Sequence, residues 1–244
     1  MTQEFTTVNT IAPLKNVALV SKVMERIIKR PPHLPGIGVV AGFSGVGKSQ
    51  GAIQAALKYR ACYVEVRSSW TKRALLEAIC LELRIPSHGP VYKLVSSISE
   101  KLAQTQQPLI IDEMDHIVKR SAVEIVRDIH DGSNAPILLI GEEHMPRHLN
   151  KWERFHGRVL EWQYAQPADA QDAKVLTTFY CKKVRIADDL LHEVARVCKG
   201  SVRRICINLA LIEEKAKRIG QEEIDLSKWG NTPFYTGDPQ EARP

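Results

Sequence analysis

The segment Gly42-Phe-Ser-Gly45-Val-Gly47-Lys48-Ser49 constrains the fold of this chain more than any other feature. It matches the pattern Gly-x4-Gly-Lys-Ser/Thr and lies between an expected strand over 37–41 and an expected helix over 48–59. The glycines allow backbone N–H groups to curl around a phosphate, and the N-terminus of the following helix favours the same negative charge. A chance glycine-rich turn is the alternative, but the flanking pattern favours a phosphate-binding loop (P-loop).

Such a loop implies roles for particular side chains. If the phosphate belongs to ATP, we expect Lys48 to reach its β- and γ-phosphates and Ser49 to ligate Mg²⁺. The loop residues expected to contact the nucleotide are Gly42, Ser44, Gly45, Val46, Gly47, Lys48, Ser49 and Gln50.

A second motif is an apolar run over 108–111 that ends in the adjacent acids Asp112 and Glu113. Asp112 is expected to hold Mg²⁺ through water, as in P-loop NTPases. Glu113 is then placed to polarise an attacking water as a general base. A solvated acidic turn is the alternative, but the position downstream of a P-loop favours the catalytic interpretation.

Strands and helices alternate along the first two thirds of the chain. Apolar runs predict strands over 37–41, 62–66, 108–112, 137–140 and 159–162, and helical spacing predicts helices over 16–30, 48–59, 71–83, 91–104 and 119–130. This alternation is typical of an α/β fold with a parallel sheet flanked by helices.

The pattern changes after Pro167. Helices are expected over 168–183, 187–198 and 202–219, with no strand, which predicts a small all-helical domain. The predicted divisions are an N-terminal extension (1–15), a nucleotide-binding α/β domain (16–163), a helical lid domain (164–225) and a mobile C-terminal tail (226–244).

Composition bounds the possible partners and compartment. The chain has 244 residues, with 34 Lys and Arg against 28 Asp and Glu, and this small basic excess permits a nucleic-acid partner without requiring one. The five cysteines have apolar neighbours and no metal-type spacing, so we expect buried, reduced thiols. The sequence has no signal-peptide pattern and no apolar run of the length a membrane span needs. We therefore expect a cytoplasmic protein without a membrane partner.

Together the P-loop and the Asp112-Glu113 pair resemble the AAA+ ATPases over roughly residues 15–220. The resemblance implies a P-loop AAA+ fold with a lid, ATP and Mg²⁺ as ligands, and ATP hydrolysis. It places Glu142 at the sensor 1 position, where the family usually has Asn, Thr or Ser, and a plain loop acid is the alternative. In Gly200-Ser-Val-Arg203, which resembles the sensor 2 motif, Arg203 would contact phosphate.

The same resemblance implies an arginine finger, a cation that reaches the ATP of the neighbouring subunit. The candidates lie just before the last predicted strand, in Arg154-Phe-His-Gly-Arg158. Arg158 is favoured because a Gly-Arg pair precedes the strand, and Arg154 is the second candidate. An ordinary surface arginine is the alternative for each.

Several segments are similar to the transposition protein B family of Mu-like bacteriophages and to the ATPase regulators of Tn7-type transposons. They include AGFSGVGKSQ, residues 63–78, PLIIDEMDHI and GSVRRI. This resemblance implies sequence-nonspecific binding to duplex DNA, assembly into a helical homo-oligomeric filament, target-DNA capture and stimulation of a transposase. Because only about 15 residues precede the first predicted helix, we expect no N-terminal helix-turn-helix domain of the kind found in this family. The resemblance also implies a bacterial host cell.

Two loops are candidates for the DNA contacts, because nonspecific binding needs cations at phosphate spacing. The first supplies Arg67, Trp70, Thr71, Lys72 and Arg73, and the second supplies Lys119 and Arg120. Solvated helix starts are the alternative for both loops, and Trp70 could be a packing residue.

Two other functions remain open from the sequence. A helicase-loader-like or secretion-associated AAA+ ATPase would act on protein partners. A small-molecule kinase would also use a P-loop, but the Asp-Glu pair and the Gly-x-x-Arg helix argue against it.

Overall fold

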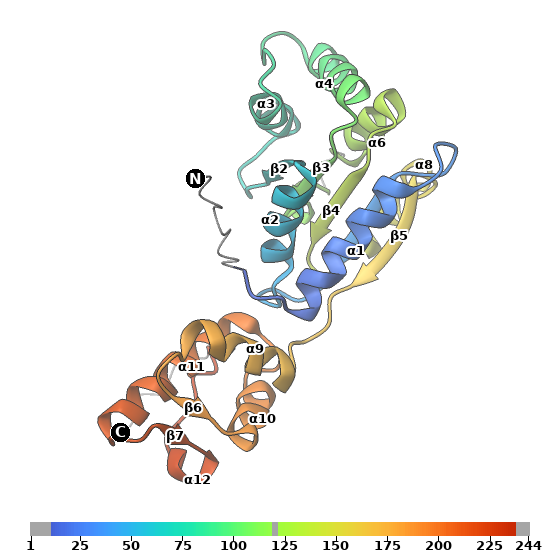
Figure 1. Ribbon diagram of the computed structural model, residues 1–244. Helices are drawn as coiled ribbons and strands as arrows, with labels where there is room; N and C mark the ends of the chain where they lie inside the picture. Colours follow the sequence, from blue (N-terminus) through green and yellow to red (C-terminus); the bar gives the residue numbers. More distant parts are fainter. Residues whose placement is uncertain (1–10, 119–121, 238–244) are drawn as a thin grey trace, which may run out of the picture. The chain divides into compact units, whose positions relative to one another are not determined.

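The computed structural model describes residues 11–118 and 122–237 (Figure 1). The chain divides into two compact units. Among the described residues, one unit comprises Asn16–Gln166, and the other combines residues 11–15 with residues 167–237. They are called the α/β unit and the helical unit below.

The α/β unit is built on a five-stranded sheet. Its strands are β1 (Ile37–Ala41), β2 (Cys62–Glu65), β3 (Leu109–Asp112), β4 (Ile137–Gly141) and β5 (Val159–Tyr164). They are all parallel, in the order β2-β3-β4-β1-β5, and every residue of β1, β3 and β4 is buried. The predicted parallel sheet flanked by helices is therefore confirmed. Because the strands are parallel, their carboxyl ends meet at one edge, where the P-loop and the acidic pair both lie.

Helices cover both faces of this sheet, since successive strand residues point to opposite faces. Val40 packs with α1 (Lys15–Lys29) and α2 (Lys48–Tyr59), whereas Val39 belongs to the core on the other face. That second core also contains residues of α3 (Lys72–Glu82), α4 (Val91–Thr105), α5 (Asp115–Val118), α6 (Ala122–Ser133), α7 (Met145–Leu149) and α8 (Glu153–His156).

The helical unit contains α9 (Ala170–Tyr180), α10 (Asp188–Val197), α11 (Val202–Arg218) and α12 (Leu226–Trp229). A reciprocal capping box between Asp169 and Asp172 starts α9. The expectation of an all-helical domain missed two short parallel strands, β6 (Arg185–Ile186) and β7 (Glu223–Ile224). Each has only two residues, too few for an alternating pattern to be recognised in the sequence.

The described part of the C-terminal segment is packed. Trp229 is 1% exposed and stacks on Phe234 with ring centroids 5.2 Å apart. The Asn208 side chain donates to the Tyr235 carbonyl at 2.9 Å and accepts from the Tyr235 N–H at 2.8 Å. Residues 226–237 of the predicted tail therefore carry packing contacts, the mobility of the tail stays a prediction, and residues 238–244 lie outside the described chain.

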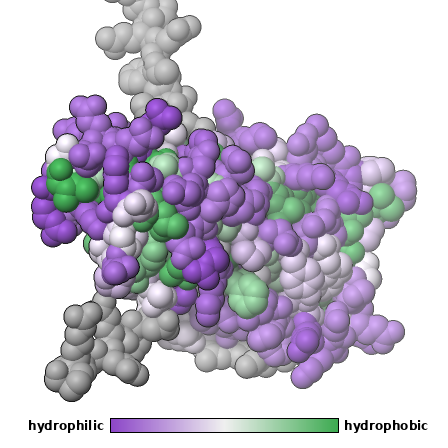
Figure 2. Space-filling view, turned by 90° about the horizontal axis from the view of Figure 1, so that it is seen from below, coloured by the Kyte–Doolittle hydropathy of each residue, from purple (hydrophilic) through white to green (hydrophobic). Residues whose placement is uncertain are grey.

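The face shown in Figure 2 is mainly hydrophilic, with apolar side chains in small separate groups. Within residues 11–118 and 122–237, no helix combines the length and apolarity that crossing a membrane requires.

Candidate active site

The P-loop connects the end of β1 to the start of α2. Gly45 and Gly47 have φ values of 80° and 96°, a left-handed conformation that glycine adopts without steric cost. A Cβ on Gly42 would lie 2.9 Å from the Ala165 Cβ, so the loop passes too close to the chain after β5 for a side chain. No described side chain caps the first turn of α2 at Gly47, and the N–H groups of this turn are therefore available to an anion.

Lys48 lies within this loop. Its ammonium group donates to the carbonyl oxygens of Gly42 and Phe43 at 2.7 and 2.8 Å. Burial lowers the pKa of Lys48, and nearby carboxylates, those of Glu113 and Asp112 foremost, oppose that shift. The loop thus holds a cation at its centre with acidic groups close by.

Asp112 ends β3 and is 1% exposed. Tyr63 of β2 donates its hydroxyl to Oδ2 at 3.1 Å, and the Glu113 N–H donates to Oδ1 at 2.9 Å. Burial raises the pKa of Asp112, whereas hydrogen bonds from Ser49, the Glu113 backbone and Tyr63 lower it. The bond with Ser49 brings the hydroxyl of the P-loop and the carboxylate of β3 together.

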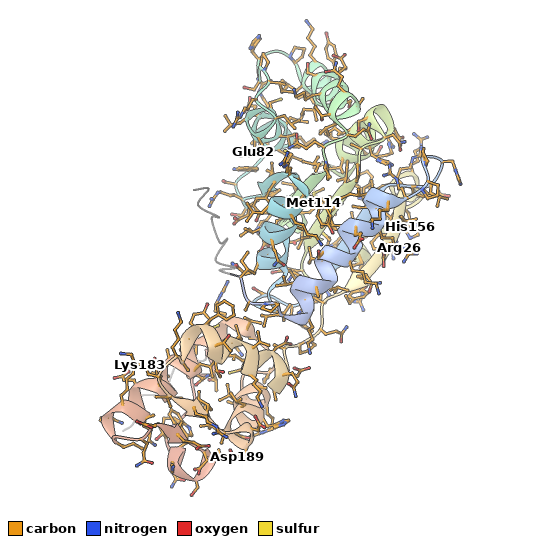
Figure 3. The ribbon with its side chains drawn as sticks, viewed as in Figure 1. Arg26, Glu82, Met114, His156, Lys183 and Asp189 are labelled. Atoms are coloured by element: carbon orange, nitrogen blue, oxygen red, sulfur yellow. The ribbon has the colours of Figure 1, made fainter. Side chains whose placement is uncertain are left out.

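Glu113 has a φ of 55°, although it is not glycine. Such backbone strain persists where the surroundings impose it, and it gathers at functional sites. The next residue, Met114 (labelled in Figure 3), is fully buried, and its N–H donates to the Ile140 carbonyl at 3.0 Å, which anchors the turn. Burial raises the pKa of Glu113, and the charges of Asp112 and Asp115 raise it further. A carboxyl group with a raised pKa is suited to accept a proton.

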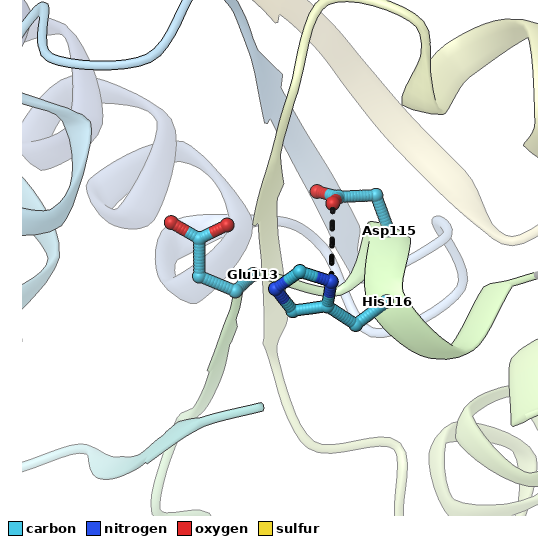
Figure 4. Close-up of side chains that lie close together, drawn as sticks. All are labelled: Glu113, Asp115 and His116. Atoms are coloured by element: carbon cyan, nitrogen blue, oxygen red, sulfur yellow. Dashed lines mark ion pairs between the residues drawn. The ribbon is translucent and has the colours of Figure 1, made fainter. Parts of the chain in front are cut away.

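Glu113, Asp115 and His116 lie together beyond the end of β3 (Figure 4). Each offers one ligand-type atom, and these atoms lie within 4.8 Å of one another. His116 Nδ1 is 4.0 Å from Asp115 Oδ2, and the His116 side chain is 38% exposed. The cluster therefore places two further polar side chains, of which that of His116 is exposed, beside Glu113.

Glu142, the predicted sensor 1 residue, follows β4 at the same sheet edge and is exposed. Its backbone N–H donates to Asp115 Oδ1 at 2.9 Å, which joins the turn after β4 to the one after β3. A Cβ on Gly141 would lie 2.5 Å from that same Asp115 oxygen, so the junction needs glycine there.

The two candidate arginine fingers differ in their surroundings. Arg158 binds Asp131 of α6 with both arms of its guanidinium group, at 2.8 and 3.0 Å. Arg154 on α8 is exposed and has no hydrogen bond or ion pair with any other residue that the structure describes. Arg158 precedes β5 and its carbonyl accepts from Ile37 at the start of β1, so it lies at the sheet edge opposite the P-loop.

Arg203, the predicted sensor 2 residue, is exposed in the first turn of α11, which Ser201 caps. It belongs to the helical unit, and its contact with phosphate stays a prediction.

The first candidate DNA loop joins β2 to α3, at the same sheet edge as the P-loop. Arg67 is exposed, and Trp70 is half-buried against the core. Thr71 caps α3 by accepting from Ala74. Arg73 pairs with Glu77 at 2.7 Å and donates to the Gly89 carbonyl at 2.8 Å, so its charge is already engaged. Lys119 and Arg120 of the second loop lie outside the described residues.

Three residues that the sequence did not single out contact the predicted site. Tyr63 donates to Asp112, and Asp115 accepts from the Glu142 backbone N–H. Asn16 is 2% exposed, and its side chain donates to the carbonyl oxygens of Val46 and Gln166 at 2.8 and 2.7 Å. Asp115 could have been suspected from its place beside the acidic pair, but Asn16 carries no local signal.

Comparisons with known proteins agree with this fold. Residues 32–149 match the family model of the AAA domain, which spans the P-loop, the acidic pair and β4. No curated protein sequence matches the chain significantly.

Several solved structures share the fold. The Aeropyrum pernix ORC2 protein, in its ADPNP–ADP complexes, aligns with a TM-score of 0.66 and 14% identity over 91% of this chain and 68% of that one. The Aeropyrum pernix ORC1 protein in complex with DNA gives 0.59 and 18%, over 87% of this chain and 62% of that chain. The Thermotoga maritima RuvB Holliday junction branch migration motor gives 0.58 and 16%, over 87% and 66%. The chain thus spans about two thirds of the length of these structures, and at these identities the likeness concerns the fold.

Proposed function

We propose that this protein is an ATPase of the AAA+ type that acts on duplex DNA. The observation that carries the ATPase assignment is the convergence of Lys48, Ser49 and Asp112 at one edge of the sheet, with Glu113 beside them. A cation, a hydroxyl and two carboxylates at the mouth of a P-loop are the groups that phosphoanhydride hydrolysis requires.

In this proposal the P-loop binds the phosphates through its backbone N–H groups and the first turn of α2. Without nucleotide, the Lys48 ammonium group donates to the Gly42 and Phe43 carbonyls. When ATP binds, it donates to phosphate oxygens instead, so the ammonium group has hydrogen-bond acceptors with and without ATP. The neighbouring carboxylates, those of Glu113 and Asp112 foremost, raise the pKa of Lys48 and so oppose the lowering by burial.

The donor set also fits Mg²⁺. Ser49 and Asp112 already approach each other through a hydrogen bond, and oxygen is the ligand atom that Mg²⁺ prefers. Mg²⁺ held by these two residues would neutralise phosphate charge in the transition state. The Tyr63 hydroxyl and the Glu113 N–H hold the Asp112 carboxylate in a fixed orientation for that role.

Glu113 is the proposed general base. Its raised pKa increases its affinity for the proton of the attacking water, and it lies in the strained turn directly after β3. The hydrogen bond from the Glu142 N–H to Asp115 joins the turn after β3, which contains Glu113, to the turn after β4.

The assignment to DNA has two supports. The first is the likeness to structures whose names include an ORC1 protein in complex with DNA and a Holliday junction branch migration motor. The second is the loop after β2, which lies at the same edge of the sheet as the P-loop. In this loop Arg67 and Lys72 form no ion pair with any described residue. These cations suit contact with phosphates and carry no base-specific geometry.

A more specific role follows from the segments that resemble Mu-like transposition proteins. The protein would assemble on duplex DNA as a helical homo-oligomer, capture it as a transposition target and stimulate a transposase. Arg154 or Arg158 would complete the ATP site of the adjacent subunit, and Arg203 would contact phosphate within its own subunit.

Electron microscopy with purified protein tests this role. DNA-dependent filaments that require ATP and vanish in Lys48→Ala support it, and adding a Mu-type transposase should then raise strand transfer. Monomers under every condition would refute the filament. An ATPase rate that responds to no DNA but rises with a protein partner would point instead to a helicase-loader-like or secretion-associated ATPase.

A further inference from the structure

Asn16 connects two segments that lie far from it in the sequence. Its side-chain amide donates to the Val46 carbonyl of the P-loop, and also to the Gln166 carbonyl after β5. Its side-chain oxygen accepts from the Gln166 N–H at 3.0 Å. All hydrogen-bonding positions except one acceptor lone pair are therefore used, in a residue that is 2% exposed.

The bond to Val46 orients a phosphate-binding group. The C=O and N–H of a trans peptide point in opposite directions, so fixing the Val46 carbonyl also fixes the Gly47 N–H. That N–H points away from Asn16, and it is one of the donors with which a P-loop surrounds phosphate. The bond from Asn16 therefore restrains the orientation of this peptide.

The bonds to Gln166 place Asn16 at both passages of the chain between the two units. Asn16 is the first residue of the α/β unit and Gln166 is its last. Within the helical unit, Lys15 binds the start of α9: its ammonium group contacts Asp169 at 2.8 Å, and its N–H donates to Asp172 Oδ1 at 3.1 Å. Asn16 thus binds the P-loop within the α/β unit, and the residue before it in the sequence, Lys15, binds the capping box of α9 within the helical unit.

We propose that Asn16 is a positioning residue that transmits the state of the P-loop to the helical unit through Gln166 and Lys15. The inference rests on the proposed nucleotide binding. When phosphate rotates the Val46–Gly47 peptide, the Asn16 amide moves with it and shifts both connections to the helical unit.

The test measures distance and affinity separately. Spin labels are attached through unnatural ketone side chains at Ala103 of α4 and Glu214 of α11, both exposed, so the native cysteines stay unmodified. Pulsed spin-resonance distances are recorded with and without saturating ATP, and binding of a fluorescent ATP analogue is titrated in parallel. ATP should change the distance distribution in the unmutated chain.

Asn16→Ala should reduce this change by more than half at saturating ATP, and should weaken ATP binding about tenfold through the freed Gly47 amide. Asn16→Asp loses both donated bonds but can still accept from the Gln166 N–H. We expect it to reduce the distance change and to weaken ATP binding as Asn16→Ala does. Lys15→Ala should reduce the distance change while ATP affinity stays within about twofold, because Lys15 does not touch the P-loop. Asn208→Ala removes another buried, fully bonded asparagine and is the matched control, for which we expect an unchanged response.

A full distance change in Asn16→Ala or in Lys15→Ala would overturn the inference. If Asn16→Ala does not fold, Lys15→Ala decides. An unmutated chain that binds ATP without any distance change also refutes the inference and leaves the proposed function standing, whereas failure to bind ATP refutes the proposed function itself.

Discussion

Asp131 binds the guanidinium group of Arg158 through both carboxylate oxygens, 2.8 Å from Nε and 3.0 Å from Nη2. This fork pairing raises the pKa of Arg158 and holds its side chain against α6 of its own subunit. Because β1 spans about 15 Å, Arg158 cannot reach the P-loop of its own chain from the opposite end of the sheet. To act on a neighbour it would first have to leave Asp131, whereas the Arg154 side chain has no such partner among residues 11–118 and 122–237.

The first prediction concerns these two arginines. Arg154→Ala should lower the DNA-stimulated ATPase rate by roughly 10³-fold with ATP affinity retained, since an arginine finger stabilises only the transition state. Mixing Arg154→Ala with Lys48→Ala subunits should restore activity, because each supplies what the other lacks. A large loss in Arg158→Ala with none in Arg154→Ala would return the role to Arg158.

Lys48→Ala should weaken ATP binding by about 10²-fold, the loss expected when a charge-assisted hydrogen bond to phosphate is removed. Isothermal titration with ATP and Mg²⁺ measures it. Lys58→Ala, on the exposed face of the same helix, is the control and should bind normally. Equal affinities in the two variants would place the nucleotide elsewhere.

Glu113→Gln should bind ATP normally and hydrolyse it about 10²–10⁴-fold more slowly, because glutamine cannot accept the proton of water. Single-turnover hydrolysis separates this step from binding. Glu143→Gln changes an acid in the turn after β4 and should retain its rate. Normal hydrolysis in Glu113→Gln would exclude Glu113 as the base.

His130 should make the α/β unit sensitive to acid. Its Nε2 accepts from the Gly36 N–H at 3.3 Å, so Nδ1 carries the proton and donates to the Ala135 carbonyl at 3.0 Å. Burial lowers the pKa of His130, and protonation would turn the acceptor of the Gly36 bond into a donor. A lowered pKa means that the unfolded state binds the proton more tightly, and the free energy of unfolding therefore rises with pH.

This contribution is present in full above the unfolded pKa of about 6.5 and is lost as pH falls through the folded value. Urea unfolding at pH 7.5, 6.5 and 5.5 should show a smaller acid loss in His130→Asn than in the unmutated chain. His192→Asn, at an exposed site, should keep the full loss. Identical pH profiles for all three proteins would rule out His130 as the cause.

The loop after β2 should contribute unequally to DNA affinity. Lys72→Ala and Arg67→Ala should each weaken binding to duplex DNA and lower the slope of log affinity against log salt by about 0.9. Arg73→Ala should have a smaller effect, since Glu77 and Gly89 already engage its guanidinium group. Lys217→Ala in the helical unit is the control, and unchanged slopes in all variants would remove this loop from the interface.

Much of the sheet was predictable because β1, β3 and β4 are short, mainly apolar runs that follow a glycine or a proline. The strand expected over 37–41 is β1 to the residue, and the run ending at Asp112 is β3. The short helices α7 and α8 escaped prediction, since four or five residues show too little periodicity. The predicted site residues Lys48, Ser49 and Asp112 do lie together. The P-loop follows β1 and Asp112 ends β3, and the carboxyl ends of these parallel strands meet at one edge of the sheet.

The contacts that support those residues could not be predicted from local patterns. Asn16 and Gln166 are separated by 150 positions, and Tyr63 and Asp112 by 49. Each pair meets only because the strand order β2-β3-β4-β1-β5 brings its elements together. The Asp131–Arg158 pair also joins residues that are distant in the sequence. It engages the arginine that the sequence motif favoured as the arginine finger, and no local pattern in the sequence indicates this pairing.

The hydrogen bonds between Asn16 and Gln166 have one more consequence, because these residues are the two ends of the α/β unit. In topological terms this unit is an insertion into the helical unit between Lys15 and Pro167. Its ends already meet, so joining them would need a very short linker and little loop-closure entropy. The α/β unit is therefore suited to circular permutation, with new termini in the exposed turn before α4 and the P-loop still attached to its own strand.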